Sequence, residues 1–243
     1  MANCQYLQPN TLRTQAYYQR RMTLAIGVSL IALSLPLIPL LSIPIAVGTR
    51  HLYKRTGRLL SGAVGEEKVV KLLRHIPDRY TLFNNVRVPT DKGFRELDIV
   101  IVGENGLIFV IEVKNMRGKI KISNINPRQW RQTWAGKTKI FPSPVHQLQG
   151  QVFALKDYLK NKGLPSWIEG AVVFSHRFVD MDEMLTIFPT LVLDDLLTYL
   201  QSFDSMRPQP RATAMIEAIA ELVPQSQSAR YNGHTLDNKR TAN

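Results

Sequence analysis

The stretch LIFVIEVK, residues 107–114, decides the fold, together with ELDIVIV at residues 96–102. Both stretches are short, apolar and rich in β-branched residues, which is typical of strands, and the first is apolar enough for the centre of a sheet. The residues between them, 103–106, read GENG, which favours a tight connection. We therefore expect the two stretches to form neighbouring strands.

The segments on either side of this pair alternate between helix and strand. Their apolar residues recur at helical or strand spacing, and glycines and prolines separate them. In chain order we expect a helix from Ser61-Gly62-Ala63 to Pro77, strands at 80–88, 96–102 and 107–113, a helix at 145–160 and a buried strand at 168–174. Residues 115–144 are basic and are expected to be irregular. The order helix, three-strand meander, helix, strand predicts a mixed α/β sheet.

The C-terminal part is predicted to add only short elements. They are a strand at 191–193, a helix at 194–203 capped by Asp194 or Asp195, and an amphipathic helix at 212–222. From Pro224 onward the chain is polar, and its composition is typical of a disordered tail.

Residues 22–47 contain no charged side chain. A run longer than about 18 apolar residues predicts a membrane-spanning helix, and it is too long for the apolar core of a cleaved signal peptide. Pro36, Pro39 and Pro44 favour a break, so a re-entrant hairpin is the alternative to a single span. Basic residues flank the run on both sides and slightly favour a cytoplasmic location for the C-terminal domain.

The net charge of +12 and the pI near 10.0 favour polyanionic partners, which are nucleic acid or an anionic lipid surface. The only cysteine is Cys4, so no disulfide can form within the chain. This fits a reducing compartment.

A candidate metal site lies at the end of the central strand. Glu112 and Lys114 are two residues apart and therefore project from one face, and Asp98 lies on the neighbouring strand. Cross-strand neighbours on one face lie about 5 Å apart, and a divalent cation relieves the repulsion between two carboxylates at that distance. Asp98, Glu112 and the Val113 carbonyl are the predicted ligands. Oxygen ligands favour Mg²⁺ or Mn²⁺ over Zn²⁺.

Such a site suits phosphodiester hydrolysis. The metal would polarise a phosphate oxygen and lower the pKa of a bound water. Lys114 would position that water or stabilise charge on the phosphate. Glu66, on the preceding helix, could approach the same cluster directly or through water. The alternative is a solvated face with surface ion pairs, because an Asp and a Glu-x-Lys pair on adjacent strands also occur by chance.

Three blocks of the sequence resemble the NERD (nuclease-related) domain of the PD-(D/E)XK nuclease superfamily. They are GAVGE at 62–66, ELDIVIV at 96–102 and GLIFVIEVKN at 106–115. A fourth block, Pro144-Val-His-Gln147, resembles the family's Pro-x-x-Gln element. The resemblance covers residues 62–175 and implies a restriction-endonuclease-like core.

The resemblance implies roles for five side chains. Asp98, Glu112 and Lys114 would be the metal-binding and catalytic triad, Glu66 the helix carboxylate and Gln147 a supporting polar residue. Two departures stand outside the triad. Glu96 occupies a position where the family often has Gln, and the segment after Lys114 lacks the family's tryptophan.

The basic segment after the metal motif is a candidate nucleic-acid surface. From Val113 to Lys156 the chain has no Asp or Glu, and two tryptophans lie among its basic residues. The predicted contacts are Arg117, Lys119, Lys121, Arg128, Trp130, Arg131, Trp134, Lys137 and Lys139. Basic residues interleaved with aromatic ones suit a phosphate backbone and unpaired bases. The tryptophans could instead pack on the core or lie at a membrane interface.

Several function classes lack their motifs. No two of the five histidines have the spacing of metal ligands, and neither a nucleophile elbow nor a P-loop is present, which argues against serine hydrolases and NTPases. The leading hypothesis is a membrane-anchored, Mg²⁺- or Mn²⁺-dependent endonuclease acting on DNA. The alternatives are a non-catalytic nucleic-acid-binding or scaffold module, and a membrane protein whose charge binds anionic lipid only.

The sequence thus predicts six regions. They are a polar N-terminal segment at 1–21, a membrane segment at 22–47, a basic linker at 48–61, the nuclease-type domain at 62–203, a C-terminal helix at 204–223 and a tail at 224–243.

Overall fold

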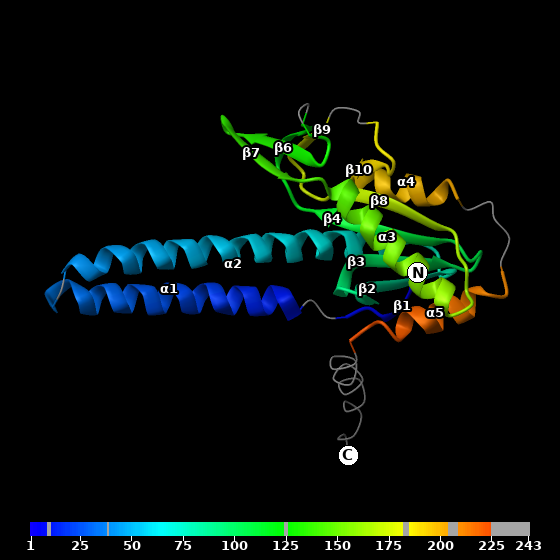
Figure 1. The fold of residues 1–243 in the computed structure, drawn as a ribbon, viewed down its shortest axis with the longest axis horizontal. Coiled ribbons are helices and arrows are strands. Elements are labelled where there is room, and N and C mark those ends of the chain that lie inside the picture. The colour runs from blue at the N-terminus through cyan, green and yellow to red at the C-terminus, as the bar shows by residue number, and fades with distance from the viewer. Residues whose placement is uncertain (9–10, 38, 124–125, 182–184, 204–208, 225–243) are drawn as a thin grey trace, which may run out of the picture. The chain divides into compact units, whose positions relative to one another are not determined.

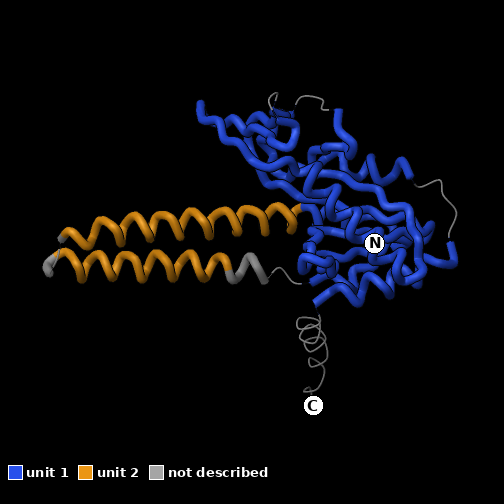
Figure 2. Tube along the Cα trace, viewed as in Figure 1, with its two compact units in different colours: residues 1–9, 69–243 blue, residues 10–68 orange. Residues whose placement is uncertain are grey.

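The computed structural model describes residues 1–8, 11–37, 39–123, 126–181, 185–203 and 209–224 (Figure 1). The chain forms two compact units (Figure 2). The helical unit is Asn10–Lys68, and the α/β unit combines Met1–Pro9 with Val69–Asn243. The predicted tail at 224–243 lies, apart from Pro224, outside the described residues.

The helical unit is a hairpin of α1 (Thr11–Leu37) and α2 (Pro39–Leu73), whose last turn belongs to the α/β unit. The Arg20 guanidinium lies 4.1 Å from the Tyr53 ring centroid, and Gly27 lies against the side chain of Thr49. Since the residue number rises along α1 as it falls along α2, the helices are antiparallel. Proline at the first position of α2 is compatible with a helix start, where its missing N–H has no partner to lose.

The hairpin corrects three expectations. The apolar run at 22–47 is divided between α1 and α2, so a single helix over it is wrong. The break lies between Leu37 and Pro39, whereas Pro44 lies inside α2. The segment 48–61 is helical rather than a linker, and no helix begins at Ser61, because α2 runs through it to Leu73. Residues 48–61 contain no proline that would interrupt the helix.

Among the residues that the structure describes, no helix has both the length and the apolar character needed to cross a bilayer.

The α/β unit is built on a six-stranded sheet. Its strand order is β1 (Asn3–Tyr6), β2 (Tyr80–Thr90), β3 (Gly93–Gly103), β4 (Ile108–Lys114), β8 (Ile168–Phe174) and β10 (Thr190–Val192). Strands β2, β3 and β4 form the predicted antiparallel meander, and β4 pairs in parallel with β8. The predicted mixed α/β fold is therefore confirmed. Strand β1, which pairs in parallel with β2, carries no sequence signal that we recognised.

Both faces of this sheet are covered. Because side chains alternate along a strand, Val100 and Val110 face one side and Ile99 and Ile111 the other. The first face packs against α3 (Pro144–Asn161) and α5 (Ala212–Ala220). The second packs against the last turn of α2, the short η1 (Leu193–Asp195) and α4 (Leu196–Gln201). Burial on both faces explains why β4 is continuously apolar up to Glu112.

Residues 115–144, expected to be irregular, instead form most of a second sheet. Its strand order is β7 (Lys137–Pro142), β6 (Gln129–Trp134), β5 (Gly118–Ile122) and β9 (Val179–Met181). In β5 the exposed Lys119 and Lys121 alternate with the buried Ile120, which is the pattern of a half-buried strand. Ala135 and Gly136, with φ of 49° and 72°, form the two-residue turn between β6 and β7.

Candidate active site

The strand pair β3–β4 brings the predicted carboxylates together. The ladder pairs Ile99 with Ile111, so the next opposing positions along it are Asp98 and Glu112. Directly opposed residues of an antiparallel pair share a face, and Lys114, two residues beyond Glu112, projects from that face too. The three predicted side chains therefore lie together near the C-terminal end of β4, on the face of the sheet that α3 covers.

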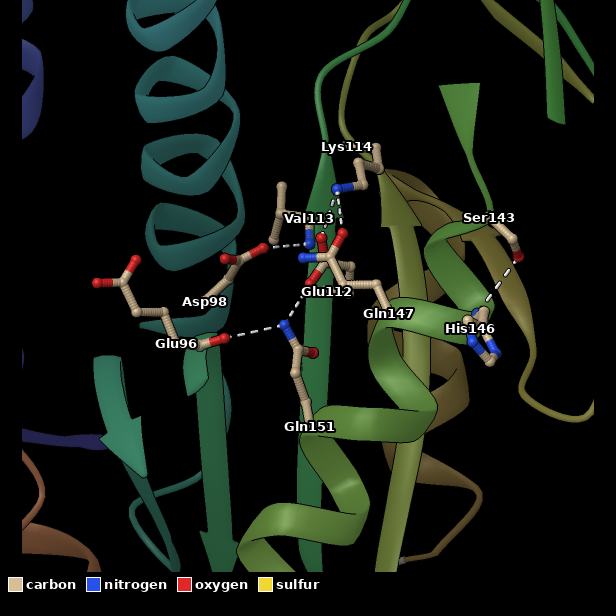
Figure 3. Close-up of polar contacts among 9 residues, drawn as sticks. All are labelled: Glu96, Asp98, Glu112, Val113, Lys114, Ser143, His146, Gln147 and Gln151. Atoms are coloured by element: carbon tan, nitrogen blue, oxygen red, sulfur yellow. Dashed lines mark hydrogen bonds and ion pairs between the residues drawn. The ribbon is translucent and has the colours of Figure 1, made fainter. Parts of the chain in front are cut away.

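Glu112 is the centre of this cluster (Figure 3). The side chain is 1% exposed, yet each carboxylate oxygen has a partner. Lys114 Nζ donates to Oε1 at 2.5 Å, and Gln151 Nε2 donates to Oε2 at 2.6 Å. Burying a carboxylate is costly unless it is paired and hydrogen-bonded, and both conditions hold here.

Asp98 is half-buried and is fixed by the neighbouring strand. Its Oδ2 accepts a hydrogen bond of 2.8 Å from the Val113 backbone N–H (Figure 3). This contact orients the Asp98 carboxylate toward the end of β4. In the structure the backbone N–H of Val113 donates to Asp98. Metal coordination by the Val113 carbonyl stays a prediction.

Helix α3 supplies two amides to the same cluster. Ser143 caps the helix by accepting from the His146 N–H, and Pro144 occupies the first turn. Gln147 Oε1 accepts a 3.0 Å hydrogen bond from Lys114 Nζ, as a supporting residue at this position would. Gln151, one turn later on the same helix face, contacts Glu112 and was not recognised from the sequence. Its spacing of four residues from Gln147 was the available signal.

The amide of Gln151 joins three elements. Its Nε2 donates both to Glu112 and, at 3.0 Å, to the backbone carbonyl of Glu96 on β3. Because both neighbours are acceptors, the orientation of the amide is fixed. Its Oε1 is buried and has no hydrogen-bond partner within the described part of the chain. The side chain of Glu96 lies away from the cluster, 74% exposed, and pairs with Arg87.

The donor set fits a hard divalent cation. Asp98 and Glu112 offer carboxylate oxygens, and an oxygen that already accepts one hydrogen bond keeps lone-pair capacity for a cation. No group of three or more His, Cys, Asp or Glu side chains with metal-binding geometry occurs in the described ranges. Mg²⁺ usually keeps several waters and uses only one or two protein carboxylates, so two are compatible with it.

Glu66 lies on α2 within the helical unit. Its predicted approach to the cluster therefore stays a prediction.

The predicted nucleic-acid residues divide into two groups. Most are exposed on or beside the second sheet, and Arg131 is half-buried; the exposed ones are Arg117, Lys119, Lys121, Arg128, Trp134, Lys137 and Lys139. Trp130 is 1% exposed and stacks on Phe174, with ring centroids 6.3 Å apart, so this side chain packs on the core, which is the alternative that the sequence also allows. Trp130 and Trp134 are four residues apart and therefore project from the same face of β6. Trp134 is the last residue of β6, next to the turn, and its side chain is exposed.

Comparison with known proteins supports the resemblance. Residues 61–175 match the family model of the nuclease-related domain (NERD). This segment is therefore similar to nuclease-related domains. It contains the meander, α3, β8 and the Asp98, Glu112 and Lys114 cluster.

The chain is also similar to a curated protein. A protein of Bacillus anthracis, described as uncharacterized, is 33% identical over 106 residues, which are 43% of this chain and 49% of that protein. The chain thus matches about half the length of this relative. No solved structure matches the chain significantly.

Proposed function

We propose that this chain is a metal-dependent nuclease that hydrolyses phosphodiester bonds in DNA, with a restriction-endonuclease-like core. One observation carries the proposal. The carboxylate of Glu112, 1% exposed, is held between Lys114 and Gln151 at the end of a central strand, beside Asp98. A buried charge arranged with this many partners is more typical of a functional centre than of a solvated face.

Each residue of the cluster has a separate proposed role. Asp98 and Glu112 would hold Mg²⁺ or Mn²⁺, with the Val113 carbonyl as a further ligand. A bound cation supplies a water of lowered pKa and neutralises charge on the phosphate. Lys114 would then place its ammonium group against the phosphate or the water.

The remaining side chains position this set. Gln147 holds Nζ of Lys114 at 3.0 Å, and Gln151 holds the second oxygen of Glu112. Orientation by fixed amides keeps the carboxylate and the ammonium group ready for the reaction geometry.

The test is cleavage of supercoiled plasmid by the full chain in Mg²⁺, Mn²⁺ or EDTA. We expect nicking that needs the metal and that Asp98→Ala and Lys114→Ala each abolish. Glu96→Gln is the matched control, because this neighbouring carboxylate points to solvent and should be dispensable. Cleavage that survives both alanine substitutions would refute the site. Salt-sensitive DNA binding without cleavage would favour the non-catalytic binding or scaffold module instead.

We also propose that the hairpin of α1 and α2 attaches the protein to a membrane. The hairpin exposes many large apolar side chains to its surroundings, namely Met22, Leu24, Ile26, Val28, Leu30, Leu33, Leu35, Leu40, Leu41, Ile43, Val47, Leu52 and Leu59. A mostly apolar space of about 660 Å³ also lies between its two helices. A water-exposed surface of this kind marks an interaction site, and lipid acyl chains are its proposed partner.

The topology of the α/β unit favours a hairpin that enters and leaves by the same leaflet. Tyr6 stacks on Phe83 with centroids 4.8 Å apart, and the Asn84 side chain bonds both the N–H and the carbonyl of Gln8. Residues before and after the hairpin belong to one folded unit, which supports a hairpin whose two ends lie on the same side of the membrane. Arginines and lysines at both bases of the hairpin favour the cytoplasmic side.

Flotation of the full chain with anionic vesicles tests this attachment. We expect the wild type to float in high salt and Leu33→Glu with Leu40→Glu to stay at the bottom of the gradient. Phe153→Glu is the control, since Phe153 is equally exposed but lies on α3. Flotation unchanged by the double substitution, or lost in Phe153→Glu, would contradict attachment through the hairpin.

A further inference from the structure

Two chain segments leave the active-site edge of the main sheet and meet again in the second sheet. Residues 115–117 lead from β4 to β5, and residues 175–178 lead from β8 to β9. The Ser175 N–H donates to the Lys114 carbonyl at 3.0 Å, and the Gly118 N–H donates to the Phe178 carbonyl at 2.7 Å. The two segments therefore stay hydrogen-bonded to each other beyond the catalytic strands.

An aromatic pair lies at the surface where these segments meet. The rings of Trp134 and Phe178 are nearly parallel, at 18°, with centroids 6.4 Å apart. The side chains are 39% and 51% exposed, although rings of this size are usually covered. The guanidinium of Arg117 lies 5.0 Å from the Trp134 ring, and that of Arg177 lies 4.4 Å from the Phe178 ring. We call these four side chains the aromatic platform.

The backbone around the aromatic platform holds it in place. Gly118 has a φ of +85°, and a Cβ there would lie 2.3 Å from the Thr133 carbonyl oxygen and 3.0 Å from Trp134. Only glycine allows the indole to rest so closely on β5. The Phe178 N–H donates to His176 Nδ1 at 3.1 Å, which constrains the backbone that carries the other ring. A surface that is already ordered loses little entropy when a ligand binds.

We propose that the aromatic platform binds unpaired bases, so that the substrate is DNA with a single-stranded segment. This inference rests on the proposed nuclease function and specifies its substrate class. Every base has a face that stacks on an aromatic ring or an arginine plane, but that face is accessible only when the base is unstacked from its neighbours. A duplex offers its groove edges instead, and no groove-reading motif is present in the sequence.

The surroundings of the aromatic platform suit a nucleic-acid backbone. Strands β5, β6 and β7 carry no acidic residue, and their exposed lysines are Lys119, Lys121, Lys137 and Lys139. Asp180 on β9 lies 4.0 Å from Lys119. The excess of positive charge around two exposed rings favours a polyanion with stacking bases over an uncharged apolar partner.

The aromatic platform is close enough to the catalytic cluster to act on the same strand. Arg117 is three positions after Lys114, so their Cα atoms are at most about 11 Å apart. A strand whose bases stack beside Arg117 would therefore pass close to Lys114.

The test is fluorescence anisotropy with a labelled single-stranded oligonucleotide and the blunt duplex of the same sequence. Binding is measured with the full-length Asp98→Ala chain in EDTA, which removes cleavage. We expect tighter binding to the single strand, and a loss of roughly tenfold or more in affinity for Trp134→Ala and for Phe178→Ala. Trp134→Phe should largely restore binding because the ring is kept. Trp167→Ala is the control, since Trp167 is 71% exposed but precedes the opposite end of β8.

Three results would overturn the proposal. One is equal affinity for the single strand and the duplex. Another is unchanged affinity in both alanine variants, whose folding is checked by circular dichroism. The last is loss of vesicle flotation rather than of DNA binding, which would assign the two rings to a membrane interface.

Failure of the platform and failure of the nuclease proposal give different results. Binding that depends on Trp134 and Phe178, without cleavage by the wild type in any metal, would keep the platform and reject the nuclease. Metal-dependent cleavage with no preference for single-stranded segments would keep the nuclease and reject the platform.

Discussion

Replacing Gln151 by Leu tests whether the buried carboxylate of Glu112 depends on α3. Leucine fills a similar volume but removes the amide that bonds Glu112 Oε2 at 2.6 Å and the Glu96 carbonyl at 3.0 Å. The Gln151 side chain is 1% exposed, so water cannot easily replace either bond.

The size of the effect follows from these contacts. A hydrogen bond to a charged group contributes about 1.5–3 kcal/mol to the free energy of unfolding, and a neutral one about 1 kcal/mol. Removing the buried Oε1, which has no partner among the described residues, offsets part of this loss. We expect a net destabilisation of about 2 kcal/mol. In a domain of this size this lowers Tm by roughly 4–8 °C.

The assay is urea denaturation of the full chain followed by circular dichroism, next to Gln149→Leu. Gln149 lies on the same helix but is exposed, so its substitution should change the free energy of unfolding by less than about 0.5 kcal/mol. The reasoning also predicts that Gln151→Leu reduces metal-dependent cleavage, because Glu112 loses one of the two groups that orient it. Equal stability of the two leucine variants would refute the contact.

Three further predictions concern parts of the chain around the site. The pKa of Glu221 is lowered and that of Lys162 is raised, each chiefly by their mutual hydrogen bond, so their pairing of α5 with α3 should stabilise the fold at neutral pH. The Tm difference between wild type and Lys162→Met should be fully present at neutral pH. It should decrease as the pH falls below the ordinary Glu pKa and as it rises above the ordinary Lys pKa, and a difference independent of pH would contradict the pairing. Ala135 has a φ of 49°, so Ala135→Gly should stabilise the protein by about 1 kcal/mol, measured as a higher Tm, and a lower Tm would show that the turn is not strained. Gly118→Ala should displace Trp134 and reduce single-strand binding about as much as Trp134→Ala, and unchanged binding would show that β5 does not position the ring.

The main sheet was predictable because its strands are buried on both faces. A continuous apolar run such as 108–111 predicts a strand buried on both faces. The two charged residues near the end of β4 then indicate a candidate site. The shared face of Asp98, Glu112 and Lys114 follows from strand parity alone.

Other features depend on contacts between segments far apart in the sequence. Trp134 and Phe178 are brought together by pairing of β5 with both β6 and β9, which no local pattern shows. The second sheet is hard to predict because lysines dominate the composition of residues 115–144, although Ile120 between two lysines has the spacing of a strand. Strand β1 has four residues and pairs with β2, which lies far from it in the sequence. No local sequence pattern therefore predicts this strand.

Electron paramagnetic resonance of Mn²⁺ added to the full chain tests whether Asp98 and Glu112 bind one divalent cation together. If Asp98 and Glu112 share one cation, the wild type and Glu96→Gln should bind a single Mn²⁺ saturably, and Asp98→Ala and Glu112→Ala should each abolish that binding. Saturable binding that survives in both alanine variants would place the metal elsewhere and contradict the account.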